Sequence, residues 1–242
     1  MKILYLDLFS GIAGDMTLSA LVDLGADPAL IMEQAKLLGI GEFRLQFNPV
    51  IKQGVSGLHL TLLEPHPHLH HASFKTIQAL IEGAGLSSKV SDHALAIFKL
   101  IAIAEGKIHN QAIEKVHFHE VGAADSLLDI LGVCLALEQL QPDLILASPV
   151  ELGHGSLTCQ HGVYPVPAPA ALEILKGVPV RGGSQAHELT TPTGAAIIKH
   201  FVTEFSAGMP AMKVEKIGYG AGTLDLNDRP NILRAIWGEA LD

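Results

Sequence analysis

Residues 115–137, KVHFHEVGAADSLLDILGVCLAL, contain the junction around which the rest of the chain is organised. Residues 116–121 alternate apolar and polar side chains, which predicts a short strand. Gly122 interrupts this alternation, a helical pattern begins at Ala123, and apolar residues occupy nearly every side of the predicted helix from Leu127 to Leu137. A helix that is apolar all round is buried. The stretch therefore predicts a strand that leads directly into a central, buried helix.

The same junction concentrates ionisable side chains. His117 and His119 share one face of the predicted strand, roughly 6–7 Å apart, where two imidazoles can bind one metal ion. Glu120 follows, and Asp125 and Asp129 lie one helical turn apart. A buried carboxylate without a partner is costly, so a cation, a basic partner or a cage of hydrogen bonds must compensate it. In the alternative interpretation, Asp125 only favours the positive end of the helix dipole and the histidines bond backbone carbonyls.

The composition limits the classes of function. The chain has 242 residues, 48% of them hydrophobic, which is enough for one large domain or two small ones. A net charge of −9 without a basic run argues against a nucleic-acid partner, whereas 13 histidines suggest metal handling. Cys134 and Cys159 form neither a disulfide framework nor a zinc motif. Because no signal peptide or long apolar run is apparent, we expect a soluble, cytoplasmic protein with no membrane partner.

The N-terminal segment predicts a strand, a glycine-rich turn and a helix. Residues 2–8 are apolar and β-prone, residues 9–16 read FSGIAGDM, and residues 17–24 have a helical pattern. Such a turn exposes backbone N–H groups that bind anions, although it matches neither the P-loop nor the dinucleotide fingerprint. Asp7 and Asp15 flank the turn, and their carboxylates would repel a bare phosphate. A bound anion would therefore imply a divalent cation between the anion and these carboxylates. Alternatively, the glycines only permit a tight turn.

Strand and helix patterns alternate along the remaining chain. Residues 153–169 predict a rigid, non-helical path, and the glycine-rich residues 217–223 are predicted to lie between two strands. The sequence therefore predicts an α/β fold, with a mixed sheet flanked by helices in a single large domain. Further strands are predicted in a hairpin over residues 43–63 that turns at Gln53-Gly54, and at residues 144–147 and 232–237. Further helices are predicted over residues 28–38, 73–83 and 170–175, from Ser87 or Ser88 to about His109, and from Pro192.

The most biased segment, residues 65–71, reads PHPHLHH. Its two prolines exclude a helix and keep the backbone extended, so alternate histidines face one way. Neutral imidazole suits Ni, Zn and Cu, and the tract predicts metal binding by His66, His68, His70 and His71. The alternative is a solvated loop with incidental affinity for metals.

Residues 188–194, ELTTPTG, predict a helix start with Thr191 as N-cap and Pro192 in the first turn. Hydroxyls and free N–H groups at a helix N-terminus form a plausible phosphate pocket, although an ordinary capped helix has the same pattern. Further on, Arg229 is expected either to clamp an anion or to pair with a buried acid.

Several long motifs, in the same order, resemble the LarC family of nickel insertion proteins. They are LDLFSGIAGDM at residues 6–16, the histidine loop at 66–71, VHFHEVGAADSLLDI at 116–130, HGVYPVPAPA at 161–170, ELTTPTGAA at 188–196, and IGYGAGTLD with RPN at 217–231. The resemblance implies a chelatase that inserts nickel into pyridinium-3,5-bisthiocarboxylic acid mononucleotide, in a reaction that consumes CTP. It also implies that residues 1–242 correspond to the N-terminal part of the family. CTP, with Mn²⁺ or Mg²⁺, would then bind to a C-terminal part that is a partner of this one.

Within this resemblance we assign roles from the chemistry of the side chains. The assignment makes Ni²⁺ the metal, bound by exchangeable nitrogen and oxygen donors. We also expect a homo-oligomer. The histidines assigned to nickel are His66, His68, His70, His71, His117 and His119; the catalytic carboxylates are Glu120 and Asp125; and the residues assigned to the mononucleotide phosphate are Ser10, Asp15, Thr191 and Thr193.

Two other functions fit the same residues. A nickel chaperone or store without turnover needs only the histidine loop. A metal-dependent phosphohydrolase would use the histidines of residues 117–119 and the acidic helix to hold two ions around a phosphate.

Overall fold

A computed structural model describes residues 1–63, 72–116, 118, 124–159 and 162–241. Within these residues the main sheet has seven strands in the order β2-β3-β10-β11-β1-β4-β9. Three neighbouring pairs, β1 with β4, β4 with β9 and β3 with β10, are parallel, and the other three are antiparallel. The predicted mixed sheet is therefore confirmed. Its strands are β1 (Lys2–Asp7), β2 (Arg44–Lys52), β3 (Val55–Leu63), β4 (Leu144–Ala147), β9 (Glu204–Phe205), β10 (Met212–Ala221) and β11 (Ile232–Ala240).

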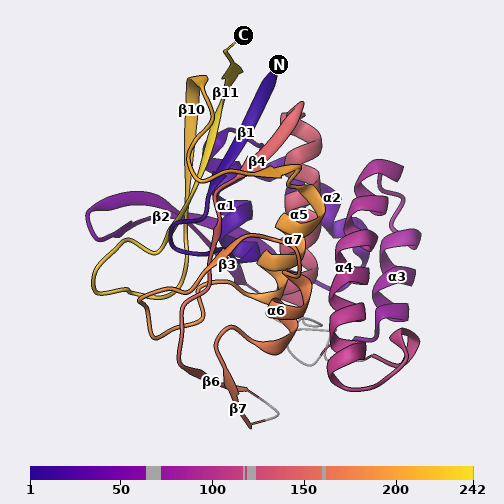
Figure 1. Cartoon of the computed structure of the whole chain (residues 1–242). Coiled ribbons are helices and arrows are strands. Elements are labelled where there is room, and N and C mark those ends of the chain that lie inside the picture. Colours follow the sequence, from indigo (N-terminus) through magenta and orange to yellow (C-terminus); the bar gives the residue numbers. More distant parts are fainter. Residues whose placement is uncertain (64–71, 117, 119–123, 160–161, 242) are drawn as a thin grey trace.

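Helices pack on one face of this sheet, in more than one layer (Figure 1). The helix α1 lies directly on strands β3, β10 and β11. Helices α5 and α7 contact α1. Helix α4 packs against α5 and α7, and α3 packs against α4. None of the helices in the described part of the chain is long and apolar enough to cross a membrane. The helices are α1 (Gly14–Leu24), α2 (Pro28–Ala35), α3 (Phe74–Gly83), α4 (Ser88–Ile108), α5 (Ala124–Leu140), α6 (Pro169–Ile174) and α7 (Pro192–Phe201), with short 3-10 turns at η1 (Lys36–Leu38) and η2 (Ile113–Lys115).

The alternation of side chains along β1 separates two apolar clusters. Leu4 and Leu6 belong to the large core that the helices cover. Ile3 and Tyr5 point to the opposite face, where they join a smaller cluster that includes Ile236. The sheet is therefore buried mainly by the helices on one side.

Side-chain caps begin four of the helices where the sequence predicts them. Asp27 accepts a hydrogen bond from the Ala29 amide, and Ser73, Ser87 and Thr191 each accept one from the third residue that follows. Each cap satisfies an amide that has no partner inside its helix.

Two glycines let α1 approach the sheet closely. A Cβ atom at Gly218 or Gly220 of β10 would clash with the carbonyl oxygens of Ala20 and Met16 on α1. The prediction that residues 217–223 lie between two strands is therefore wrong, because most of them belong to β10 itself. Glycine here serves helix packing rather than a turn.

The described part of residues 153–168 is non-helical, as predicted, up to the start of α6 at Pro169. It contains a small hairpin of β6 (Ser156–Cys159) and β7 (Gly162–Pro165) that the sequence did not identify, and β5 (Val150–Glu151) pairs with β8 (Val180–Arg181). The strand predicted over residues 116–121 falls largely outside the described residues. Its described members, Val116 and Phe118, are buried; the Val116 carbonyl accepts from the Phe74 amide, and the Phe118 amide donates to the Ala72 carbonyl.

Candidate functional site

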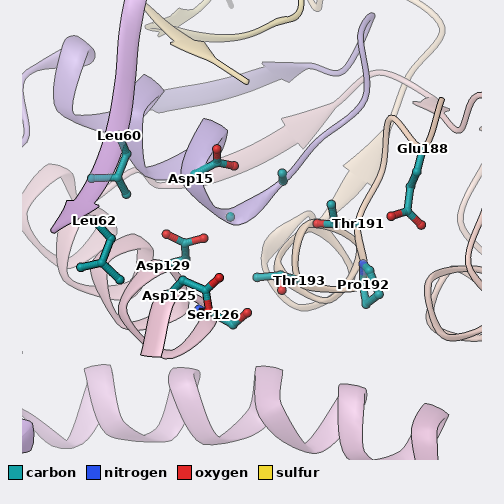
Figure 2. Close-up of a pocket in the computed structure, with 12 residues that line it drawn as sticks. Asp15, Leu60, Leu62, Asp125, Ser126, Asp129, Glu188, Thr191, Pro192 and Thr193 are labelled. Carbon is teal, nitrogen blue, oxygen red and sulfur yellow. Dashed lines mark hydrogen bonds between the residues drawn. The ribbon is translucent and has the colours of Figure 1, made fainter. Parts of the chain in front are cut away.

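A cavity of about 370 Å³ opens where the starts of α1, α5 and α7 meet the end of β3. Its volume falls within the range of small-molecule sites, about 300–1,000 Å³. Aspartates from α1 and α5 point into the space between β3 and the start of α7 (Figure 2). The lining residues are Ala13, Gly14, Asp15, Leu60, Leu62, Asp125, Ser126, Asp129, Glu188, Thr191, Pro192 and Thr193.

Three helix N-termini face this cavity. Ala13 occupies the N-cap position of α1 but offers no side-chain hydrogen bond to the helix. In α7 the Thr191 hydroxyl accepts from the Gly194 amide at 3.2 Å. The first turn of α5 contributes Asp125 and Ser126. Because N–H groups at helix starts carry a partial positive charge, their convergence favours an anionic ligand.

Backbone hydrogen bonds fix the starts of α1 and α7 side by side. The Ile12 amide donates to the Leu189 carbonyl at 2.9 Å, and the Thr191 amide donates to the Ile12 carbonyl at 3.1 Å. Gly11 has a φ of +81°, and a Cβ there would clash with the Leu189 carbonyl. A Cβ at Gly194 would likewise meet the Ile12 carbonyl. The two glycine-containing segments therefore interlock and set one wall of the cavity.

Asp129 reaches from α5 to the start of α1. Its Cβ and Oδ2 atoms both lie 2.7 Å from the position that a Cβ on Gly14 would take. Burial raises the pKa of Asp129 well above its usual value, and the nearby charges of Asp15 and Asp125 raise it further. The backbone amide of Asp15 acts in the opposite direction. Asp129 thus occupies the place in front of α1 that an N-cap side chain would otherwise fill.

The pKa of Asp15 is also raised, chiefly by burial. The backbone amide of Met16 and the charge of His59 partly offset this, and Asp125 adds to it. No Lys or Arg occurs among the lining residues that the structure describes. Carboxylates enclosed in this way are neutralised either by protons or by a cation.

Four of the residues that the sequence assigns to the site share this cavity: Asp15, Asp125, Thr191 and Thr193. Ser10 is not among its lining residues; its hydroxyl is buried and donates to the Pro230 carbonyl at 2.8 Å. The other assigned residues, His66, His68, His70, His71, His117, His119 and Glu120, lie outside the described part of the chain. Among described residues, no group of three or more His, Cys, Asp or Glu side chains is arranged to hold a metal ion.

The sequence alone did not identify several features of the cavity. Ser126 and Glu188 line it, as do Leu60 and Leu62 at the end of β3. Leu60 and Leu62 alternate along their strand, which indicates a shared face but not what that face meets.

Arg229 takes the second of its two expected roles. It pairs with Glu151, which is 8% exposed, at 3.3 Å, and it donates to the Ser184 hydroxyl at 2.8 Å and to the Phe9 carbonyl at 3.3 Å. Its guanidinium also lies over the Phe9 ring. Arg229 therefore fixes the loop that begins at Phe9.

The fold and the cavity define an α/β protein with an acidic cavity at converging helix N-termini. A family model described as nickel insertion protein matches residues 4–242. The chain therefore belongs to the nickel insertion protein family.

Curated relatives agree with this membership. The pyridinium-3,5-bisthiocarboxylic acid mononucleotide nickel insertion protein of Geobacillus kaustophilus is 48% identical over 99% of this chain and 60% of its own length. The protein of the same name from Staphylococcus epidermidis is 47% identical over 97% of this chain and 59% of its own. A putative nickel insertion protein of Wolinella succinogenes is 48% identical over 98% of this chain and 60% of its own. No solved structure matches the chain significantly.

This chain thus spans about three fifths of the length of the relatives it matches.

Proposed function

We propose that this chain takes part in nickel insertion into pyridinium-3,5-bisthiocarboxylic acid mononucleotide, and that the cavity binds both Ni²⁺ and the mononucleotide. The observation that carries the proposal is the meeting of three helix N-termini with Asp15, Asp125 and Asp129 in one cavity. Helix starts attract the phosphate of a mononucleotide. The carboxylates attract a divalent cation, which also screens them from the phosphate.

The chemistry of the donors suits a metal that has to leave. Nickel in the finished cofactor is bound to the organic ligand, so the protein must release it. Carboxylate and imidazole ligands exchange more readily than a set of soft thiolates. Cys134, the cysteine whose side chain is described, is buried in α5 away from the cavity, and its burial raises the pKa of its thiol. The cavity therefore offers hard donors to nickel and no thiolate from this residue.

The histidines outside the described residues extend the same proposal. His66, His68, His70 and His71 would capture nickel, and His117, His119 and Glu120 precede α5, whose first turn lines the cavity. On the family resemblance, CTP with Mn²⁺ or Mg²⁺ would be used through a C-terminal part. The chain would then work as one partner of a CTP-dependent chelatase.

Nickel calorimetry on a defined background tests the cavity. In the loop variant, His66, His68, His70 and His71 are replaced by Ala. Nickel binding by these histidines then cannot hide nickel binding at the cavity. Into this variant we would introduce Asp15→Asn or Asp129→Asn, each of which removes a charge at almost constant volume. We expect nickel affinity to fall by at least about tenfold. Asp92→Asn, on the exposed side of α4, is the matched control and should change nothing.

A second readout is the product itself. The unmodified chain, mixed with nickel, the mononucleotide, CTP and a separately made C-terminal part, should yield the nickel-containing cofactor, detectable by mass spectrometry. The two aspartate variants should yield much less. If the loop variant binds no nickel at all and no product forms under any condition, the protein is better described as a nickel store. Unchanged affinity and product in both aspartate variants would refute the cavity as the site.

A further inference from the structure

Four large apolar side chains are exposed together on the side of the sheet away from the helices. Phe9, Met209, Val214 and Ile217 are 41–49% exposed, and all four line one hollow of about 420 Å³. Single exposed apolar residues are common on proteins, whereas a cluster of them marks a site of interaction. These four residues, together with Arg234 in the same hollow, are called the open-face surface below.

The register of the sheet fixes the side on which this surface lies. Ile217 pairs with Ile236 in the β10–β11 ladder, and Ile236 pairs with Tyr5 of β1. Tyr5 and Ile236 belong to the smaller apolar cluster, on the face of the sheet away from α1 and the other described helices (Figure 1). Gly218, the neighbour of Ile217, points instead toward α1. The open-face surface and the acidic cavity are therefore on opposite sides of the sheet.

The composition of this region is that of a protein interface. A second hollow of about 330 Å³, lined in part by Val55 and Tyr219, adjoins the first, and Phe9 and Arg234 line both. Aromatic residues, Met and Arg are enriched at protein interfaces, and Lys and Glu are depleted. Among the residues that the structure describes, neither hollow is lined by Lys or Glu. Two adjoining hollows of this composition suit a polypeptide better than a single small molecule.

Phe9 is held in its exposed position. The Arg229 guanidinium lies 5.3 Å from the centroid of the Phe9 ring and donates to the Phe9 carbonyl at 3.3 Å. Arg229 is itself fixed by its ion pair with Glu151. A side chain that is ordered before binding loses little conformational entropy when a partner covers it. Ala13, four positions after Phe9, lines the acidic cavity, so one loop connects the open-face surface with the cavity.

The lengths of the relatives indicate which polypeptide covers this surface. The matches span 97–99% of this chain but 59–60% of the relatives, so about two fifths of each relative lies outside the match. Two parts of one chain meet at a high effective concentration, and interfaces between such parts are more polar than obligate interfaces. A surface that combines apolar side chains with an arginine fits an interface of this kind.

We propose that the open-face surface is the docking site for this remaining part of the relatives, whether it is joined to this chain or made separately. The inference rests on the proposed function, in which the chain works with such a partner. Docking there leaves the mouth of the acidic cavity free and places the partner beside the loop that leads to it.

Binding of the remaining part of the Geobacillus kaustophilus relative, made as a separate protein, tests the proposal. Ile217→Lys and Met209→Lys each introduce a charge into the surface, one from β10 and one from the loop before it. We expect each to weaken the affinity measured by calorimetry by at least about tenfold, because an unpaired charge would be buried at the centre of the interface. Both side chains are exposed, so the thermal unfolding midpoint should stay within about 2 °C of the parent's.

Leu172→Lys is the matched control. Leu172 is 50% exposed on α6, among the helices on the other side of the sheet. This substitution adds the same charge to an exposed leucine and should leave the affinity unchanged.

A fusion gives a second measurement that does not require the remaining part to fold by itself. In a chain that continues from this one into the remaining part of the same relative, a photo-crosslinking amino acid at position 217 should crosslink to that part. The same amino acid at position 172 should not. If position 217 crosslinks no more than position 172, and Ile217→Lys and Met209→Lys bind like the parent, the inference is overturned.

Two further results separate the possible explanations. If the parent chain self-associates in analytical ultracentrifugation and Ile217→Lys makes it monomeric, a second copy covers the surface and the inference is overturned. In the loop variant, Ile217→Lys should leave nickel affinity unchanged. Failed docking together with weaker nickel binding in Asp15→Asn would therefore remove the docking site alone, whereas normal docking with unchanged nickel binding in Asp15→Asn and Asp129→Asn would refute the cavity alone.

Discussion

Gly14→Ala should separate the helices that enclose the cavity. The added Cβ would lie 2.7 Å from both Cβ and Oδ2 of Asp129 and 2.9 Å from Cγ2 of Thr193. Carbon atoms in contact normally stay about 3.5–4.0 Å apart, so a displacement on the order of 1 Å is needed. The Oδ2 atom can rotate away, but the Cβ atom of Asp129 is attached to the backbone of α5. The clash is therefore relieved mainly by moving α1 from α5.

The expected cost follows from these contacts. Overpacking of this kind costs about 1–3 kcal/mol. Replacing glycine with alanine in a helix returns up to about 1 kcal/mol. After this gain is subtracted, we expect a net destabilisation of up to about 2 kcal/mol in urea unfolding. At about 2–4 °C per kcal/mol for a domain of this size, the thermal midpoint should fall by up to about 8 °C. Nickel binding should weaken as well, because the same movement displaces Asp129 from the start of α1.

Gly83→Ala, at the last residue of α3, is the control for helix propensity. A Cβ there meets nothing within 4 Å. This substitution should leave stability unchanged or raise it, with normal nickel binding. A Gly14→Ala protein as stable as the Gly83→Ala protein would refute the close packing of α1 on α5.

Other substitutions test single contacts. Asp129→Asn should raise the free energy of unfolding at neutral pH, because the folded protein then no longer has to keep a buried carboxyl group protonated or carry its charge. The pKa of Asp129 is raised in the folded state, so the unmodified protein should lose stability as the pH rises from 3.8 through that folded-state pKa. Urea unfolding measured across this pH range should show a weaker loss of stability in Asp129→Asn. Thr191→Ala should cost about 0.5–2 kcal/mol through loss of the N-cap of α7; Thr191→Ser, which keeps the hydroxyl, should behave like the parent in the same measurement. Arg229→Ala should cost about 3–5 kcal/mol because it leaves Glu151 buried without its partner; a thermal midpoint equal to the parent's would contradict this reading of the ion pair.

Local chemistry explains which parts of the fold the sequence could predict. Asp27 followed by Pro28 and Thr191 followed by Pro192 are helix starts that depend on a few adjacent residues. The hairpin of β2 and β3 turns at Gln53 and Gly54, whose φ angles of 47° and 80° suit a two-residue turn. These elements need no knowledge of distant contacts.

Features set by distant partners were harder to predict. Gly218 and Gly220 looked like loop residues in the sequence. The α1 backbone, whose close approach requires glycine at these positions, lies about 200 positions earlier in the chain. The β6 and β7 strands are short and largely exposed, so they lack the apolar alternation that identifies a strand.

The candidate site was predicted residue by residue but not as an arrangement. Asp15 was recognised beside a glycine-rich turn, Asp125 as a carboxylate one turn from Asp129 on a buried helix, and Thr191 as an N-cap. Their meeting in one cavity depends on the packing of α1, α5 and α7, which no local pattern contains. Ser10 was assigned with Asp15 because both belong to the glycine-rich turn at residues 9–16, yet its hydroxyl donates to the Pro230 carbonyl instead.

The walls of the cavity come from segments near residues 14, 60, 126 and 192, and interlocked backbones join the first of these to the last. A chain that is still emerging during synthesis has no such chamber until almost all of these residues have been made. Under the proposed function, the metal would then be accepted only by molecules that have finished folding. Nickel retention would in that case report on maturation, and partly folded chains would not hold the ion.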